Sequence, residues 1–97
     1  MFGDTEVWVI VIEWGDLDDI EIRVAPTETI ARKAARVAVI EQMKATVPEY
    51  NPDGCREFVL AESDIDDAAW LAALHEITTV PWVTIERHVV AINPVSV

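Results

Sequence analysis

Two short acidic motifs contain the residues whose type and spacing come closest to a metal site. Both follow the pattern D-x-D-D, the first at Asp16, Asp18 and Asp19 and the second at Asp64, Asp66 and Asp67. A calcium loop of the EF-hand type needs oxygen ligands at alternating positions, a glycine after them and a glutamate at its end. The first motif lacks that glycine, so we interpret it as a solvated turn. The second precedes an apolar helical pattern, and capping of that helix explains its carboxylates without a ligand.

Histidine and cysteine, the other residue types that bind metals or attack substrates, are sparse. His75 and His88 each lack a second histidine or cysteine at metal-ligand spacing. Cys55 is the only cysteine, which rules out an internal disulfide and a multi-cysteine zinc or iron–sulfur site. Ser63 and His75 belong to no nucleophile motif. We therefore predict no enzyme activity, no metal and no cofactor, and keep a small enzyme that uses a histidine as the least favoured alternative.

The charge balance is strongly acidic, with 18 Asp and Glu against 7 Lys and Arg and a net charge of −11. Such a chain repels phosphate backbones, so we predict no direct binding of nucleic acid. A dense acidic surface can instead dock on a basic protein, or serve only solubility or tolerance of salt. The longest apolar run, Val7 to Ile12, is six residues. That run is too short to span a membrane, and no signal peptide is evident, so we expect a cytoplasmic protein.

The apolar patterns place these residues on a small number of elements. Residues 6–14 are apolar on both sides and rich in β-branched and aromatic residues, which predicts a central strand. Residues 15–19 form a turn that begins with Gly15, and residues 19–25 alternate as a half-buried edge strand. We expect Ile20, Ile22 and Val24 to face the core of this hairpin, and Glu21 and Arg23 to face solvent.

The rest of the chain continues the pattern within one domain, residues 1–97. Pro26 and Thr27 precede an alanine-rich helix that runs to about residue 45. Residues 56–62 are interpreted as a third strand. Ser63 or Asp64 begins a short second helix with an apolar stripe. Residues 82–92 predict a last strand, interior to the sheet. The predicted order is β-β-α-β-α-β.

This order, with the stretch IEIRVAPTETIARKAARV that leads from the second strand into the helix, resembles the ubiquitin-like β-grasp superfold. The resemblance implies a mixed four-stranded sheet packed on one long helix, with the first and last strands adjacent and parallel. The chain ends NPVSV and lacks the Gly-Gly end of ubiquitin-like modifiers and sulfur carriers, so conjugation and sulfur transfer have no support. Ferredoxins on this fold need four cysteines. The alternative fold is a ferredoxin-like α+β sandwich.

One thin helix covers only one face of such a sheet, which leaves the other face for a partner. We predict a protein-binding face that combines an apolar stripe with a charged border. Its residues are Val7, Val9, Val11, Glu13, Glu21, Arg23, Glu86 and His88. The expected partner is another protein with a basic surface, or a second copy of the chain, giving a dimer.

These inferences together predict a small acidic protein-binding module. It would act as an accessory, regulatory or inhibitory factor, a class that includes many proteins encoded by phages and mobile elements. The alternative from a different class is a structural subunit of a larger assembly, such as part of a virion. The fold alone does not choose between them.

Overall fold

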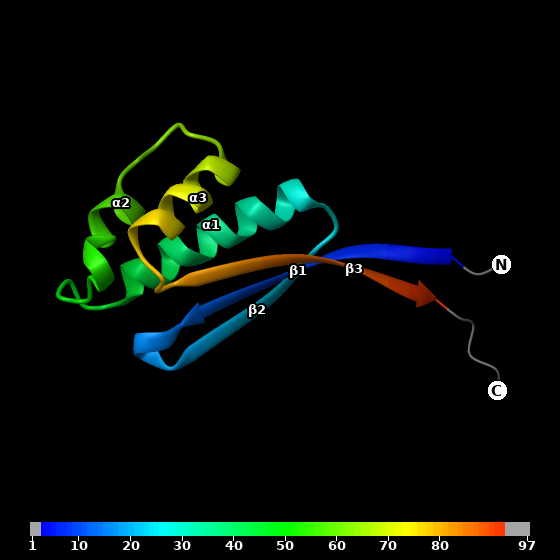
Figure 1. Ribbon diagram of the computed structural model, residues 1–97, viewed down its shortest axis with the longest axis horizontal. Coiled ribbons are helices and arrows are strands. Elements are labelled where there is room, and N and C mark those ends of the chain that lie inside the picture. The colour runs from blue at the N-terminus through cyan, green and yellow to red at the C-terminus, as the bar shows by residue number, and fades with distance from the viewer. Residues whose placement is uncertain (1–2, 93–97) are drawn as a thin grey trace.

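A three-stranded antiparallel sheet in the order β2-β1-β3 carries three helices on one side (Figure 1). The computed structural model describes residues 3–92. The strands are β1 (Gly3–Trp14), β2 (Asp19–Ala25) and β3 (Trp82–Ile92), and the helices are α1 (Glu28–Ala45), α2 (Arg56–Leu60) and α3 (Asp67–Ile77). The α+β class, the initial hairpin, the long helix and the last strand are confirmed.

The long helix α1 begins and packs as its sequence predicts. The side chain of Thr27 accepts a hydrogen bond from the backbone N–H of Ile30 at 3.1 Å, which caps the helix. The residues that α1 buries follow helical spacing and are mostly small: Ala31, Ala35, Ala38, Val39 and Met43. Because these side chains are short, the helix lies close to the sheet. The large buried side chains come from elsewhere, chiefly Trp14 of β1 and Trp70 of α3.

Three predictions about the strands and their arrangement are wrong. Residues 56–60, predicted as part of a third strand, form α2, because Cys55 and Val59 are the buried residues and their spacing of four suits a helix. The last strand lies beside the first, as expected, but it forms an edge of the sheet and not its interior. The two strands also run antiparallel, with Trp82 opposite Glu13 and Val90 opposite Thr5. The mixed four-stranded sheet, the β-β-α-β-α-β order and the β-grasp arrangement are therefore not confirmed.

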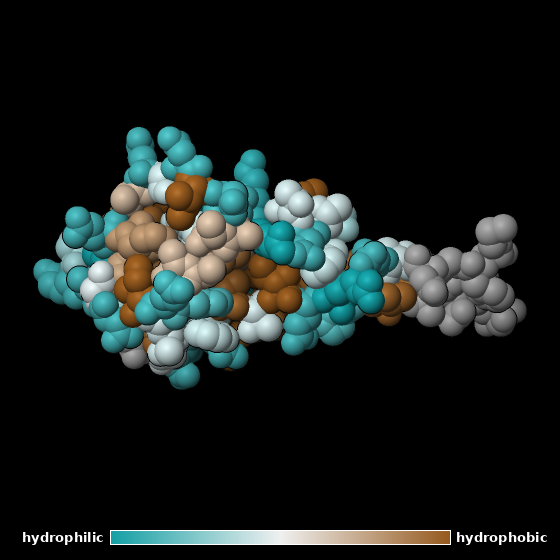
Figure 2. Space-filling view, turned by 45° about the horizontal axis from the view of Figure 1, so that its top comes forward, coloured by the Kyte–Doolittle hydropathy of each residue, from teal (hydrophilic) through white to brown (hydrophobic). Residues whose placement is uncertain are grey.

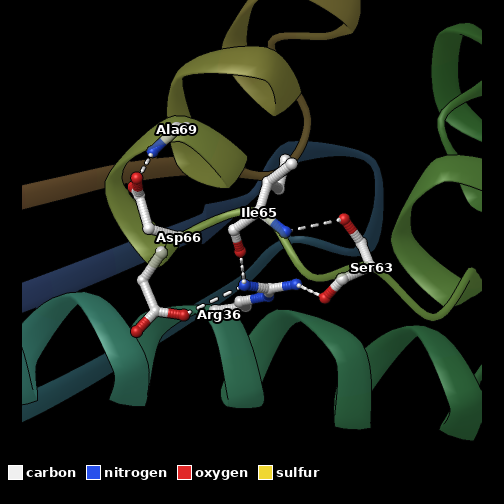
Figure 3. A network of polar contacts seen from close by, with 6 residues as sticks. Arg36, Ser63, Ile65, Asp66 and Ala69 are labelled. Carbon is white, nitrogen blue, oxygen red and sulfur yellow. Dashed lines mark hydrogen bonds and ion pairs between the residues drawn. The ribbon is translucent and has the colours of Figure 1, made fainter.

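Arg36 of α1 forms hydrogen bonds to the loop between α2 and α3 and to the start of α3 (Figure 3). Its guanidinium donates to the backbone carbonyls of Ile65 at 2.7 Å and Ser63 at 3.0 Å, and to Asp67 Oδ1 at 3.1 Å. The same group lies 5.2 Å from the ring centre of Trp70, within cation–π distance. Asp66 then caps α3 by accepting from the N–H of Ala69 at 2.8 Å. The acidic residues Asp66 and Asp67 of the second motif thus have structural partners.

Strands β1 and β3 extend beyond both β2 and the helices. The pairing with β2 ends where Trp8 meets Ala25, but the pairing with β3 continues to Gly3 and Ile92. We call this two-stranded extension, residues 3–7 with 88–92, the arm. It projects from the helical body in Figures 1 and 2, and it gives the molecule extents of 55 × 29 × 19 Å. Its radius of gyration of 16.0 Å exceeds the roughly 13 Å typical of a compact domain of this length.

Candidate functional site: the open face of the sheet

The side of the sheet that carries no helix is the candidate functional site, and we call it the open face. Directly paired residues of neighbouring antiparallel strands point to the same side of a sheet. The buried residues Ile10, Ile12 and Val83 mark the side that the helices cover. The strand pairings then assign the opposite set to the open face: Val7, Val9, Val11, Glu13, Ile20, Ile22, Val24, Trp82, Thr84, Glu86, His88 and Val90.

The most exposed part of the open face is the apolar row along β2. Ile20, Ile22 and Val24 are exposed by 64%, 65% and 64%. The half-buried valines of β1 lie beside this row, with Val11 opposite Ile22 and Val9 opposite Val24. Five branched apolar side chains therefore form one continuous surface over two strands. Isolated exposed apolar residues are ordinary, but a contiguous group of this kind is typical of an interaction site.

The prediction that Ile20, Ile22 and Val24 face the core is wrong, and the turn explains why. The hairpin connects Trp14 to Asp19 through four residues, and these two residues pair directly. Asp19 therefore shares the side of Trp14, which is buried under the helices, and the even-numbered residues of β2 point the other way. A change of one residue in register reverses every side chain of a strand. The backbone of Asp18, not Gly15, takes the left-handed conformation, with φ of 50°.

The structure brings together six of the eight residues predicted for the protein-binding face. Val7, Val9, Val11, Glu13, Glu86 and His88 all lie on the open face. Glu21 and Arg23 do not, because the register of β2 turns them to the helix side, where they form an ion pair with each other. The apolar residues of β2 that replace them were missed. The sequence showed that these residues alternate with polar ones, but it did not show which side of the sheet they would face.

Carboxylates border the apolar surface. Glu86 lies opposite Val9, and Glu13 lies between Ile20 and Trp82. At the hairpin tip a shallow hollow of about 300 Å³ is lined in part by Glu13, Asp18 and Asp19. Among the described side chains of the open face no lysine or arginine occurs, and His88 is its one basic residue, 3.4 Å from Glu86. The face combines an apolar centre with an acidic border.

The other residues whose types could bind a metal or act as a nucleophile, His75 and Cys55, do not belong to the open face, although His75 contacts Trp82 at its end. The ring of His75 stacks on Trp82, with ring centres 4.1 Å apart, and its Nε2 accepts the backbone N–H of Val83 at 3.2 Å. Burial lowers the pKa of His75, which favours the neutral ring that this bond requires. Cys55 is fully buried, and burial raises the pKa of its thiol. Contacts within the fold hold the ring of His75, and burial encloses the thiol of Cys55.

The side chain of Asp16, the first residue of the first acidic motif, lies outside the described part of the structure. Among the described side chains, no three of Asp, Glu, His or Cys lie close enough together to hold an ion. None of the described helices combines the length and the apolar character needed to cross a membrane.

Comparison with protein-family models, with curated proteins and with solved structures finds no match to this chain.

Proposed function

We propose that the chain is a protein-binding module that docks a partner on the open face of its sheet. The observation that carries this proposal is the row formed by Ile20, Ile22 and Val24, each about two-thirds exposed, beside the valines of β1. Burying one such side chain stabilises a complex by up to about 1.5–3 kcal/mol, so a partner that covers the row gains substantially. An accessory, regulatory or inhibitory role fits a module whose main surface feature is a docking face.

The border of the face selects the chemistry of the partner. Glu13, Glu86 and, at the hairpin tip, Asp18 lie around the apolar centre, and the whole chain carries a net charge of −11. A partner with an apolar centre and a basic border matches this face, and its lysines or arginines would meet the carboxylates. Charge complementarity of this kind accelerates association and rejects wrong partners more than it adds affinity.

Two copies of the chain are poorly suited to stack face against face. Such stacking would bring the carboxylates of two acidic surfaces together, and like charges across an interface disfavour binding. We therefore assign the open face to a different, basic protein. A structural role in a larger assembly would use the same surface, with a neighbouring subunit as the basic partner.

A pair of matched variants tests the proposal. Val24 on the open face and Val47 in the loop after α1 are both exposed by 64%. Val24→Glu places a charge in the apolar row, while Val47→Glu makes the same chemical change at the same exposure elsewhere. A basic protein captured with the unmodified chain should bind Val24→Glu at least tenfold more weakly, a loss of about 1.4 kcal/mol, and should bind Val47→Glu with unchanged affinity.

The salt dependence of the same complex separates the two parts of the face. The association rate should fall as ionic strength rises from about 0.05 to 0.5 M, because screening weakens attraction to the carboxylate border. The dissociation rate should change little, because the apolar row holds the partner. Equal affinity for the two glutamate variants would reject the open face as the docking site.

A further inference from the structure

We infer that the outer edge of β3 pairs with the same edge of a second copy of the chain, joining two sheets into one. This interface is separate from the open face and goes beyond the proposed function. Three features support it: the outward hydrogen-bonding groups of β3, the residues that the pairing would bring together, and the arm, which no helix or third strand of the described chain covers.

The hydrogen-bonding groups of β3 show which part of its edge is available. In a strand, successive N–H and C=O groups point alternately to the two sides. The N–H of Val83 donates to His75 Nε2 at 3.2 Å, so it points away from β1, and this first outward group is already occupied. The next outward groups belong to Ile85, Arg87 and Val89. No strand of the described chain lies beside them, because β3 is the edge of the sheet.

A two-fold axis at Arg87 gives these groups a complete set of partners. Arg87 would pair with Arg87 of the second copy, and Ile85 with Val89 of the second copy. Both residues of each pair have outward N–H and C=O groups, so each pair can exchange two main-chain hydrogen bonds. Because the axis keeps each residue on its own side of the sheet, the two open faces would be continuous with each other.

The side chains match in this register. On the open face Glu86 of each copy would lie opposite His88 of the other, and Thr84 opposite Val90. On the helix side Ile85 would lie opposite Val89, and each Arg87 brings its own counter-ion, because Glu6 lies 3.5 Å from it. Shifting the axis to Glu86 would place two carboxylates opposite each other on the open face, where no described lysine or arginine lies beside them. Like charges on directly facing residues destabilise a sheet, and at Arg87 the neighbouring carboxylate of Glu6 offsets this repulsion.

In the dimer the second copy would cover the arm, beside which the described residues place only two strands. Along the helix side of β3 exposure rises from 6% at Val83 to 57% at Val89, as the strand leaves the helices. A ribbon of two strands is marginally stable in water. In the proposed pairing, residues 88–90 would lie beside residues 84–86 of the second copy, next to the part of β3 that its own helices cover. Each arm would then have three-stranded support next to a helical body.

Proline variants test the pairing without breaking the single chain. Val89→Pro removes an outward N–H of β3, and Ile22→Pro removes an outward N–H of β2, at the opposite edge of the sheet. A proline is tolerated where the N–H of an edge strand faces solvent. Sedimentation equilibrium should show the unmodified chain and Ile22→Pro in a monomer–dimer equilibrium with a dissociation constant of about 10–100 μM, and Val89→Pro weakened at least tenfold. Circular dichroism confirms that each variant is folded.

Cysteine variants test which residues of the two copies are paired, and this test does not require the proline variant to fold. Residues paired across a two-fold axis have Cα atoms about 5.5 Å apart, within the range of a disulfide. Arg87→Cys should therefore form a disulfide-linked dimer on oxidation. Val89→Cys should not, because the two copies of residue 89 would be about 13 Å apart along the strands. Cys55 is buried in both variants and serves as an internal control.

The outcomes that overturn the inference are distinct from those that overturn the docking proposal. A chain that stays monomeric up to about 1 mM, or a dimer that Val89→Pro leaves unchanged, contradicts pairing through β3. Cross-linking of Val89→Cys equal to that of Arg87→Cys contradicts the register. None of these results depends on whether Val24→Glu loses a partner on the open face.

Discussion

Val24 lies directly opposite Val9 across β2 and β1, on the side of the sheet that carries no helix. This one pairing fixes which residues of the hairpin are available to a partner. It places an isoleucine–valine row outside and turns Glu21 and Arg23 toward the helix side.

Because Val24 is exposed and Val83 is buried, we predict that replacing each with threonine will change the free energy of unfolding by different amounts. Val24→Thr should change the free energy of unfolding by no more than about 0.5 kcal/mol, because the residue is exposed. Val83→Thr should cost about 1–3 kcal/mol, because Val83 is 6% exposed and the new hydroxyl would be buried. Urea unfolding followed by tryptophan fluorescence measures both. Equal losses would mean that β2 buries its apolar residues.

We predict that replacing Arg36 will destabilise the fold much more than replacing Arg32 of the same helix. Arg36→Met removes hydrogen bonds to two carbonyls and to Asp67, so it should cost about 2–4 kcal/mol of stability. Arg32, one turn earlier, pairs with Glu28 at the surface, and Arg32→Met should cost less than about 1 kcal/mol. Thermal unfolding of the two variants provides the comparison, and similar losses would show that the loop between α2 and α3 does not depend on Arg36.

We predict that the folding stability of the chain depends on pH through His75. Its pKa is lowered in the folded chain, so the unfolded chain takes up a proton first as the pH falls. Stability is therefore greatest above the ordinary histidine value of about 6.5 and declines as the pH drops below it. His75→Phe keeps a ring beside Trp82 and should flatten the decline between about pH 7 and 5.5, while other groups titrate as before. Identical profiles for the two proteins would contradict the neutral ring.

Cys55 should react only when the chain opens. Its side chain is fully buried, and its raised pKa further limits formation of the thiolate. At about pH 8, a thiol reagent should label Cys55 of the native protein only as fast as the fold opens to expose it. In urea, where the chain is unfolded, labelling should be immediate. Rapid labelling of the native protein would show that Cys55 is accessible.

Periodicity predicted the elements of this fold better than their orientation. Ile20, Ile22 and Val24 were visible as one side of a strand, but the side they face depends on the four-residue turn and on the left-handed backbone of Asp18. The direction of β3 depends on the path taken by α2 and α3, which local pattern does not encode. Residues 56–60 alternate like a strand and also place Cys55 and Val59 at helical spacing, and tertiary packing decides between the two.

The candidate site was predicted through β1 and missed on β2. Val7, Val9 and Val11 could be assigned because a central strand must place one side away from a single layer of helices. The row of β2 contradicts the usual rule that the apolar side of an amphipathic strand faces the core. Departures from such local rules are expected where a surface serves a function.

The most direct test is to map the surface that a basic partner contacts, by recording amide chemical shifts of the labelled chain as the partner is added. The open-face account predicts that the largest changes fall on β2 and on residues 7–13 of β1, with little change on the outer surfaces of α1 and α3. Changes confined to the helices, with residues 20–24 unaffected, would contradict it.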